Sequence, residues 1–229
     1  MARRDDPGPQ RPRLASDLAV TPADDLYDDG DGPDWAGLAV HGDLVDWEAD
    51  GLTVTGCRLA ALQLTGARLE KARFVDVLFE SCELSGAVLT QASFLRVELR
   101  QCRLVGSVWT GARLRHVRID GCKLDRVAWN EVHAEDLLVS GSLLVEADLA
   151  GAQLAGARFA DCDLGRADLS GASMTGARLH GSRLDGVKGV RGLAGAHIDS
   201  FQVLALAPLL LADIGIAVDD PDPVDPLDD

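Results

Sequence analysis

Hydrophobic residues recur along this chain with a period of five residues, from Leu52 to Val187. Every residue in this range whose number ends in 2 or 7 is Ala, Cys, Ser, Val or Leu, and most of those ending in 4 or 9 are Leu, Phe or Trp. A spacing of two residues is strand alternation, whereas a helix face needs spacings of three and four. Each pentapeptide is therefore predicted to form one short side of a coil, with its first and third residues facing inward. The fifth residue, often glycine, turns the corner.

Like residues recur at intervals of 20, which predicts four sides per coil. Cys82, Cys102 and Cys122 follow this spacing, and an unbroken series of leucines runs at the same interval from Leu64 to Leu184. Residue n should then lie under residue n+20, with a rise of roughly 4.8 Å per coil. Residues 52–187 would make about 6.8 coils and a rod of about 33 Å. The predicted fold class is an all-β solenoid.

Individual units carry a family resemblance. The sequences ADLAG at Ala147–Gly151 and ADLSG at Ala167–Gly171 resemble the A(D/N)LXX units of pentapeptide-repeat proteins. The resemblance covers residues 52–187, and that family folds as a right-handed quadrilateral β-helix. It therefore implies the handedness and the square cross-section of the coil.

The N-terminal third of the chain predicts two further segments. Residues 1–34 are rich in Asp, Pro and Gly, which is typical of a disordered acidic tail. Residues 35–51 bring Trp35 and Trp47 directly before the repeat, and an open solenoid end needs a cover over its core. We expect an N-terminal cap or an irregular first coil there.

After the repeat, residues 188–218 predict an apolar helical cap. Asp199 and Gln202 form a capping-box pattern, Pro208 should kink or divide the helix, and Gly215 is a C-cap. The helix is too apolar for one buried face. One side can close the last coil and another can meet a second subunit, so this is the dimerisation candidate. Its interface candidates are Leu206, Leu209 and Leu210. Residues 219–229 predict a second acidic tail.

The segment Gly195–Val218 resembles the end of the mycobacterial fluoroquinolone-resistance pentapeptide proteins. That resemblance implies a homodimer through the C-terminal helix, although Pro208 departs from the pattern. Some pentapeptide-repeat dimers mimic duplex DNA and occupy the DNA site of DNA gyrase. The resemblance therefore implies a DNA-mimicking modulator of DNA gyrase as one function.

The charge distribution argues against mimicry. Residues 1–50 carry 4 Arg and 13 Asp or Glu, and residues 191–229 carry 1 Arg and 8 Asp, while residues 51–190 have 17 basic and 16 acidic residues. Mimicry requires a row of negative charge that matches the DNA phosphates. Outward arginines, among them Arg58, Arg113 and Arg158, interrupt any such row. The overall charge of −15 also argues against direct nucleic-acid binding.

No pattern of catalytic or metal-binding residues is present in the sequence. The five cysteines sit at inward positions, no zinc-ligand spacing occurs, and the five histidines share no column. We therefore expect a non-enzymatic protein without a cofactor or metal. The unpaired cysteines and the missing secretory signal predict a cytoplasmic protein, and no apolar run is long enough to span a membrane.

Two outward features are candidates for protein contact. Val88, Val108 and Ala128 align at intervals of 20 as an apolar strip. Leu138 and Leu143 lie outward in residues 131–144, where Ala134 replaces a large central residue. This stretch is either a locally weak coil or a contact point. The function predicted is an interaction scaffold for an unknown protein partner, with modulation of DNA gyrase as the alternative.

Overall fold

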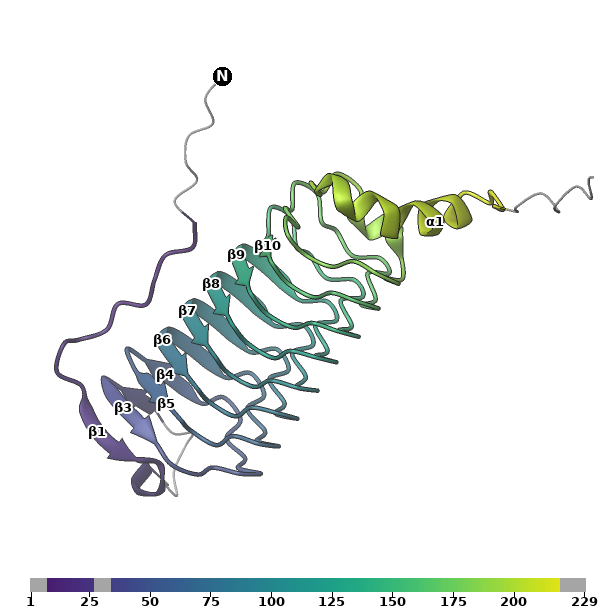
Figure 1. Cartoon of the computed structure of the whole chain (residues 1–229). Helices are drawn as coiled ribbons and strands as arrows, with labels where there is room; N and C mark the ends of the chain where they lie inside the picture. The colour runs from purple at the N-terminus through teal and green to yellow at the C-terminus, as the bar shows by residue number, and fades with distance from the viewer. Residues whose placement is uncertain (1–7, 27–33, 219–229) are drawn as a thin grey trace, which may run out of the picture.

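The chain folds into an elongated β-solenoid of about seven turns, which a computed structural model describes for residues 8–26 and 34–218 (Figure 1). Strands on successive coils are parallel and pair with an offset of 20 residues, as in Phe74 with Phe94 and Phe94 with Leu114. The predicted all-β solenoid, a right-handed quadrilateral β-helix with an apolar C-terminal helix, is confirmed. Its elements are β1 (Ala19–Pro22), η1 (Ala23–Leu26), β2 (Asp34–Ala36), β3 (Leu38–His41), β4 (Thr53–Thr55), β5 (Arg58–Ala60), β6 (Arg73–Glu80), β7 (Ser93–Arg100), β8 (Arg113–Asp120), β9 (His133–Ser140), β10 (Arg158–Ala160), η2 (Val190–Leu193), η3 (Ser200–Gln202) and α1 (Val203–Asp213).

The interior follows the predicted columns. Residues ending in 2, 7, 4 and 9 form one continuous hydrophobic core, and all five cysteines lie in it as free thiols. Its aromatic residues stack between coils: the rings of Phe74 and Phe94 lie 5.0 Å apart, and those of Phe94 and Trp109 lie 4.5 Å apart. Burial of these side chains supplies the main driving force for stacking one coil on the next.

Each corner requires a left-handed backbone conformation. Glycine adopts it at many corners. Among the described residues, fifteen that are not glycine also have a positive φ, and the number of each of them ends in 1 or 6. Asp76 (φ 55°) and Arg96 (φ 52°) are examples. Side chains disfavour this region, so closure of the coil determines the corner conformation whichever residue stands there.

Strands β6 to β9 each bend at such a corner and so supply two adjacent sides of the solenoid. We call the side formed by residues 73–75, 93–95, 113–115 and 133–135 the first-half face. The side formed by residues 78–80, 98–100, 118–120 and 138–140 is the second-half face.

The solenoid begins with an irregular coil. Trp35 pairs with Val54 at an offset of 19 residues, whereas Asp43 pairs with Gln63 at the regular offset of 20. Trp35 is buried, and its ring stacks on that of Trp47 at 5.5 Å. Of the two forms expected for residues 35–51, the structure therefore shows the irregular first coil.

The prediction that all of residues 1–34 form a disordered tail is wrong for residues 8–26. Strand β1 pairs in parallel with β3, and Ala23 in the following turn is buried. Residues before β1 run back along the solenoid (Figure 1). This segment is polar and proline-rich, so its composition carries no sign of its docking. Residues 1–7, 27–33 and 219–229, which include the second predicted tail, lie outside the described residues.

The C-terminal end closes with η2, η3 and α1. The capping box is present: the Asp199 N–H donates to Gln202 Oε1 at 2.7 Å. Gln202 is buried in line with Cys162 and Ser182, and its Nε2 donates to the carbonyls of Leu179 (2.7 Å) and Ser182. Pro208 lies inside α1 and does not divide it, contrary to one of the two expected outcomes.

Candidate functional site

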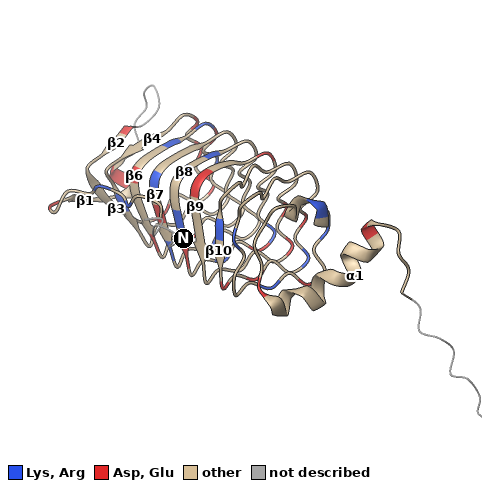
Figure 2. Ribbon diagram, turned by 90° about the horizontal axis from the view of Figure 1, so that it is seen from above, with Lys and Arg blue, Asp and Glu red and all other residues tan. Residues whose placement is uncertain are grey.

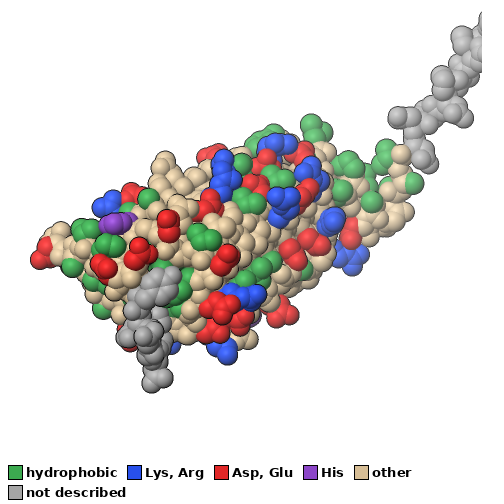
Figure 3. Space-filling model, turned by 90° about the horizontal axis from the view of Figure 1, so that it is seen from below, with side chains coloured by type: hydrophobic (Ala, Val, Ile, Leu, Met, Phe, Trp, Pro, Cys, Tyr) green, Lys and Arg blue, Asp and Glu red, His purple; other side chains and the backbone are tan. Residues whose placement is uncertain are grey.

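Ion pairs between neighbouring coils place basic and acidic side chains next to one another on the solenoid surface. Because residue n+20 lies beside residue n, arginines meet carboxylates across the coil spacing, as in Arg96 with Asp76 and Arg183 with Asp163. Basic and acidic side chains are therefore interspersed in the faces that Figures 2 and 3 show. Further pairs of this kind are Arg68–Glu48, Arg103–Glu83, Arg115–Glu135 and Arg166–Glu146. Among the described residues, no row of carboxylates runs unpaired along the rod.

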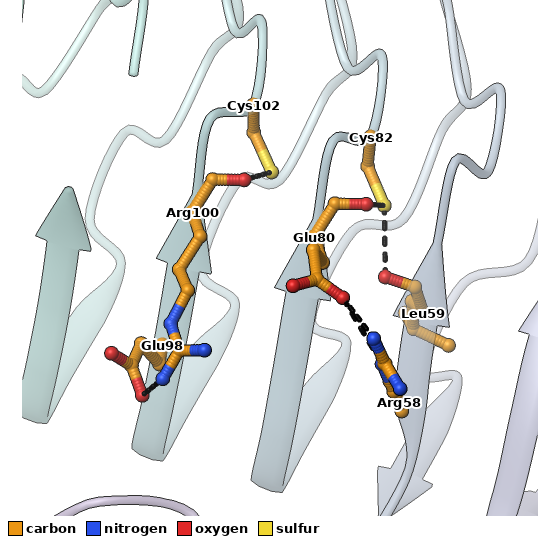
Figure 4. Close-up of polar contacts among 7 residues, drawn as sticks. All are labelled: Arg58, Leu59, Glu80, Cys82, Glu98, Arg100 and Cys102. Carbon is orange, nitrogen blue, oxygen red and sulfur yellow. Dashed lines mark hydrogen bonds and ion pairs between the residues drawn. The ribbon is translucent and has the colours of Figure 1, made fainter. Parts of the chain in front are cut away.

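The second-half face shows how core and surface alternate along the chain. Arg58 pairs with Glu80, and Arg100 pairs with Glu98 at 2.9 Å (Figure 4). Two residues after each of these strands, the thiols of Cys82 and Cys102 turn inward and contact backbone carbonyls (Figure 4). The ionisable groups are thus directed outward and the sulfur atoms inward.

All five cysteines are buried in the core as free thiols. Burial raises the pKa of the Cys57 thiol, and it raises that of Cys162 to about 11. Nucleophilic chemistry requires the thiolate, and these thiols are protonated at neutral pH. In residues 8–26 and 34–218, no three His, Cys, Asp or Glu side chains are grouped to hold a metal ion.

The predicted strip of Val88, Val108 and Ala128 is aligned as expected. The three residues form successive bridges on one side of the rod and are half-buried. Arg68 precedes them in the same column and Asp148 follows. The strip is therefore a short apolar patch with charged ends, which is too small to require a partner.

Leu138 and Leu143 do not come together. Leu138 lies on the second-half face between Arg118 and Arg158, and it is half-buried. Leu143 is on the next side of the coil, where 40% of it is exposed. The corner between them separates the two leucines, so they are not one contact surface.

A hollow of about 430 Å³ lies on the first-half face and includes Ala134. Arg73, Arg113 and His133 line it in one column, and Arg115 pairs with Glu135 beside them. The hollow extends over the coils from Arg73 to Gln153, and residues 133–135 are its only part within the stretch 131–144. Strand β9 pairs there at the regular offset of 20 residues, as in Leu114 with Ala134. Arg73 and Arg113 are 40 residues apart, and this spacing was the available sequence signal for an aligned basic column.

The three leucines proposed for the helix interface have different environments. Leu206 is buried against the last coil, with 3% exposed, so the expectation that it faces a partner is wrong. Leu209 packs partly against the core. Leu210 is 47% exposed and borders a hollow of about 470 Å³ with Leu193 and Ile198.

The exposed apolar side chains gather at this C-terminal end. Leu204 is 84% exposed, although it lies in the first turn of α1. The other exposed members are Ile198, Phe201, Val203, Leu210, Ile214, Ile216 and Val218. We call this set the C-terminal apolar surface. None of the described residues forms a helix with the length and apolarity that a bilayer crossing requires.

Comparison with protein families agrees with the coil geometry. The family description "Pentapeptide repeat region" matches residues 52–129, and "Pentapeptide repeats (8 copies)" matches residues 152–188. The chain belongs to the pentapeptide-repeat family. The two matches begin at residue 52 and end at residue 188, so they coincide with the predicted repeat of residues 52–187 to within one residue.

Solved structures of other pentapeptide-repeat proteins resemble this chain in fold. A trypsin-treated variant of QnrB1, a plasmid-mediated fluoroquinolone resistance protein, is 24% identical with a TM-score of 0.46, over 88% of this chain and 97% of that one. HetL from the cyanobacterium Nostoc sp. strain PCC 7120, a protein involved in heterocyst differentiation regulation, is also 24% identical. Its TM-score is 0.32, over 67% of this chain and 75% of that one. No curated protein sequence matches significantly.

Proposed function

We propose that this pentapeptide-repeat protein is a non-enzymatic interaction scaffold that works as a homodimer joined through its C-terminal apolar surface. The observation that carries the proposal is the difference between the two ends of the rod. At the N-terminal end, β1 pairs with β3 of the first coil, and Ala23 of η1 is buried there. At the C-terminal end, α1 covers the last coil but leaves its own outer side apolar and exposed.

A second copy of the same chain fits that outer side. The residues of α1 are apolar except Asp213, and the Asp213 carboxylate pairs with Arg191 at 2.7 Å. Within Val203–Asp213 no other side chain is charged, so this helix offers a polar partner little to bind. In a twofold dimer each subunit buries the same patch, so the apolar surface of one copy would cover that of the other. Removing this area from water supplies the favourable free energy.

The scaffold role is supported by the outward residues of the coils. Corners with a positive φ hold many residue types, among them Asp, Arg, Gln and Ser, while the inward columns form the continuous hydrophobic core. Solenoids of this kind present long surfaces to partner proteins. The described surface mixes charges and small apolar patches, which suits a protein partner. Buried free thiols fit the reducing cytoplasm that we expect as the compartment.

The alternative function, modulation of DNA gyrase by DNA mimicry, requires an acidic row. The ion pairs between coils break up such a row in the part of the chain that the structure describes. This supports the scaffold over the mimic. A supercoiling assay with purified DNA gyrase, with and without a fluoroquinolone, separates the two. We expect no effect of the protein, and inhibition or protection would favour mimicry.

The dimer is tested by light scattering coupled to size exclusion. We expect twice the chain mass of 24.2 kDa for the wild type and a monomer for Leu204→Asp. Leu204 is almost fully exposed and lies in the first turn of α1, where a carboxylate suits the helix dipole, so the monomer fold should not suffer. Val20→Asp is the matched control, because Val20 is 71% exposed at the opposite end. A wild-type chain that is monomeric at about 100 μM, which means a Kd above that concentration, would refute the dimer.

A further inference from the structure

The segment before β1 lies against the second-half face of the solenoid. Residues 8–18, which we call the strap, run along the outside of the coils from the level of β8 and β10 to β1 (Figures 1 and 2). The path is opposite to the direction in which the coils stack. None of the strap residues belongs to a helix or strand.

The first anchor of the strap is a backbone carbonyl. Pro9 is buried, and its oxygen accepts hydrogen bonds from Arg118 Nε at 3.0 Å and from Arg118 Nη2 at 2.7 Å. Gly8 precedes it with φ 70°, in a position where a Cβ atom would lie 2.9 Å from Arg158 Nη2 and 3.3 Å from Arg118 Nη2. Burial lowers the pKa of Arg118, and the positive charges of Arg11 and Arg158 lower it further. The guanidinium groups therefore hold a backbone segment that lacks a side chain at this point.

The second anchor is a backbone amide. The Arg13 N–H donates to Asp76 Oδ1 at 3.0 Å, and Arg96 holds the Asp76 carboxylate with two further hydrogen bonds. Asp76 and Arg118 are two coils apart, about 9.6 Å along the rod. Pro9 and Pro12 favour the polyproline II conformation, in which the four steps from Pro9 to Arg13 rise about 12 Å. An extended proline-containing peptide therefore matches the spacing of the two anchors.

The strap covers the second-half face between the two anchors but does not pack tightly against it along its whole length. Glu98 faces outward in the ladder between Leu78 and Arg118 and is nevertheless buried, with 6% exposed, as expected beneath the strap. Closer to β1, a hollow of about 500 Å³ remains between the strap and the coils. Leu14 and Leu18 of the strap line it on one side, and Leu78 and Arg100 of the coils line it on the other. A segment held by a few contacts over a hollow opens at low free-energy cost.

We propose that the second-half face is a docking groove for an extended, proline-containing peptide, that the strap is its intramolecular ligand, and that a partner peptide of the same chemistry displaces the strap. Both anchors recognise backbone atoms, a carbonyl at Arg118 and an amide at Asp76, so they do not depend on the strap's own side chains. The requirements are a proline that fits the Pro9 position and a residue before it that tolerates the space between Arg118 and Arg158. This names the kind of partner for the proposed scaffold and rests on that role.

Displacement is tested with a fluorescein-labelled peptide of residues 8–18 and the full chain, by fluorescence anisotropy. We expect weak binding to the wild type, because the strap occupies the groove. The Gly8→Ala chain should bind the probe about tenfold more tightly, since a left-handed alanine weakens the strap and leaves the groove intact. Gln10→Ala, at an exposed strap residue, is the matched control and should bind like the wild type.

The groove itself is tested by Arg118→Lys in the Gly8→Ala background. Lysine keeps the charge but loses the two-pronged donor that holds the carbonyl, so we expect at least a fivefold loss of probe binding. Equal binding by the wild type and Gly8→Ala, or by the Gly8→Ala chains with Arg118 and with Lys, would overturn the proposal.

The position of the strap on its own chain is tested in the Leu204→Asp background. If straps instead docked on a second copy, this chain would stay dimeric and the probe would make it monomeric, which would overturn the intramolecular assignment. Probe binding to a monomeric chain is independent of the C-terminal apolar surface. Failure of the groove and failure of the proposed dimer are therefore distinguishable.

Discussion

Asp76 and Arg96 stand at the same corner on successive coils and are joined by two hydrogen bonds, each of 2.7 Å. Their side chains are only 13% and 18% exposed, whereas those of the comparable pair Glu146 and Arg166 are 46% and 64% exposed. The hydrogen bonds from Arg96 lower the pKa of the Asp76 carboxyl below its usual value. The corner of Asp76 and Arg96 thus carries a more buried ion pair than the corner of Glu146 and Arg166, in addition to the turn of the backbone.

This pair predicts a pH-dependent stability difference. A carboxyl whose pKa is lowered in the folded state stabilises the protein above its unfolded pKa of about 3.9, and the contribution is lost as the pH falls through the folded value. Asp76→Asn should therefore reduce the free energy of unfolding by about 1 kcal/mol at pH 7, allowing for solvent screening. The deficit should shrink below about pH 4. Urea unfolding at pH 7 and at pH 2.5 measures it, with Glu146→Gln as the exposed control. An equal deficit at both pH values would assign the effect to packing.

The buried hydroxyl of Ser107 predicts that alanine destabilises the fold at this position, although alanine fills the equivalent place in the preceding coil. Ser107 Oγ accepts the Trp109 Nε1–H at 3.0 Å and donates to the Leu104 carbonyl at 2.9 Å. Ala87 fills the equivalent place one coil earlier. Ser107→Ala leaves the indole N–H unpaired in the core and should cost about 1–3 kcal/mol. Ser93→Ala, at a half-buried outward serine, should cost less than about 0.5 kcal/mol. Equal thermal midpoints for the two variants would contradict the prediction.

The corner conformation predicts opposite effects of two substitutions. Gly86 has φ 67°, and a Cβ there would meet nothing within 4 Å, so Gly86→Ala tests the backbone alone. It should cost about 1 kcal/mol, whereas Lys71→Gly, at φ 57°, should be neutral or stabilising. Gly165 has no positive φ, and a Cβ there would lie 3.0 Å from Asp163 Oδ1, so Gly165→Ala measures the cost of crowding without backbone strain. Chemical denaturation of the three variants decides the point, and a stabilised Gly86→Ala would show that the corner tolerates side chains freely.

The core of this protein could be predicted from its sequence because the coil repeats one simple rule. A two-residue alternation and a 20-residue recurrence place Phe74 on Phe94 without any long-range information. The capping box of Asp199 and Gln202 is likewise a local pattern. The stretch around Ala134, which the sequence marked as a weak coil or a contact point, forms the regular strand β9.

The remaining features depend on contacts that leave no periodic trace. The strap docks through its backbone, at the Pro9 carbonyl and the Arg13 amide, and hydrophobic patterning contains no signal for such contacts. Leu206 and Leu210 could not be told apart, because α1 is apolar on every side and only the tertiary structure decides which side meets the last coil. The 19-residue offset between Trp35 and Val54 falls outside the regular frame.

Because each side has five residues and each coil has four sides, only insertions of certain lengths keep the inward columns in register. Twenty inserted residues would restore every downstream face and move it along the axis by one coil, about 4.8 Å. Five inserted residues would also keep the inward columns intact, yet they would turn everything downstream by a quarter of a revolution. Evolution can therefore re-aim the face that carries Arg118 relative to α1, or lengthen the distance between them, in fixed steps and without redesigning the core.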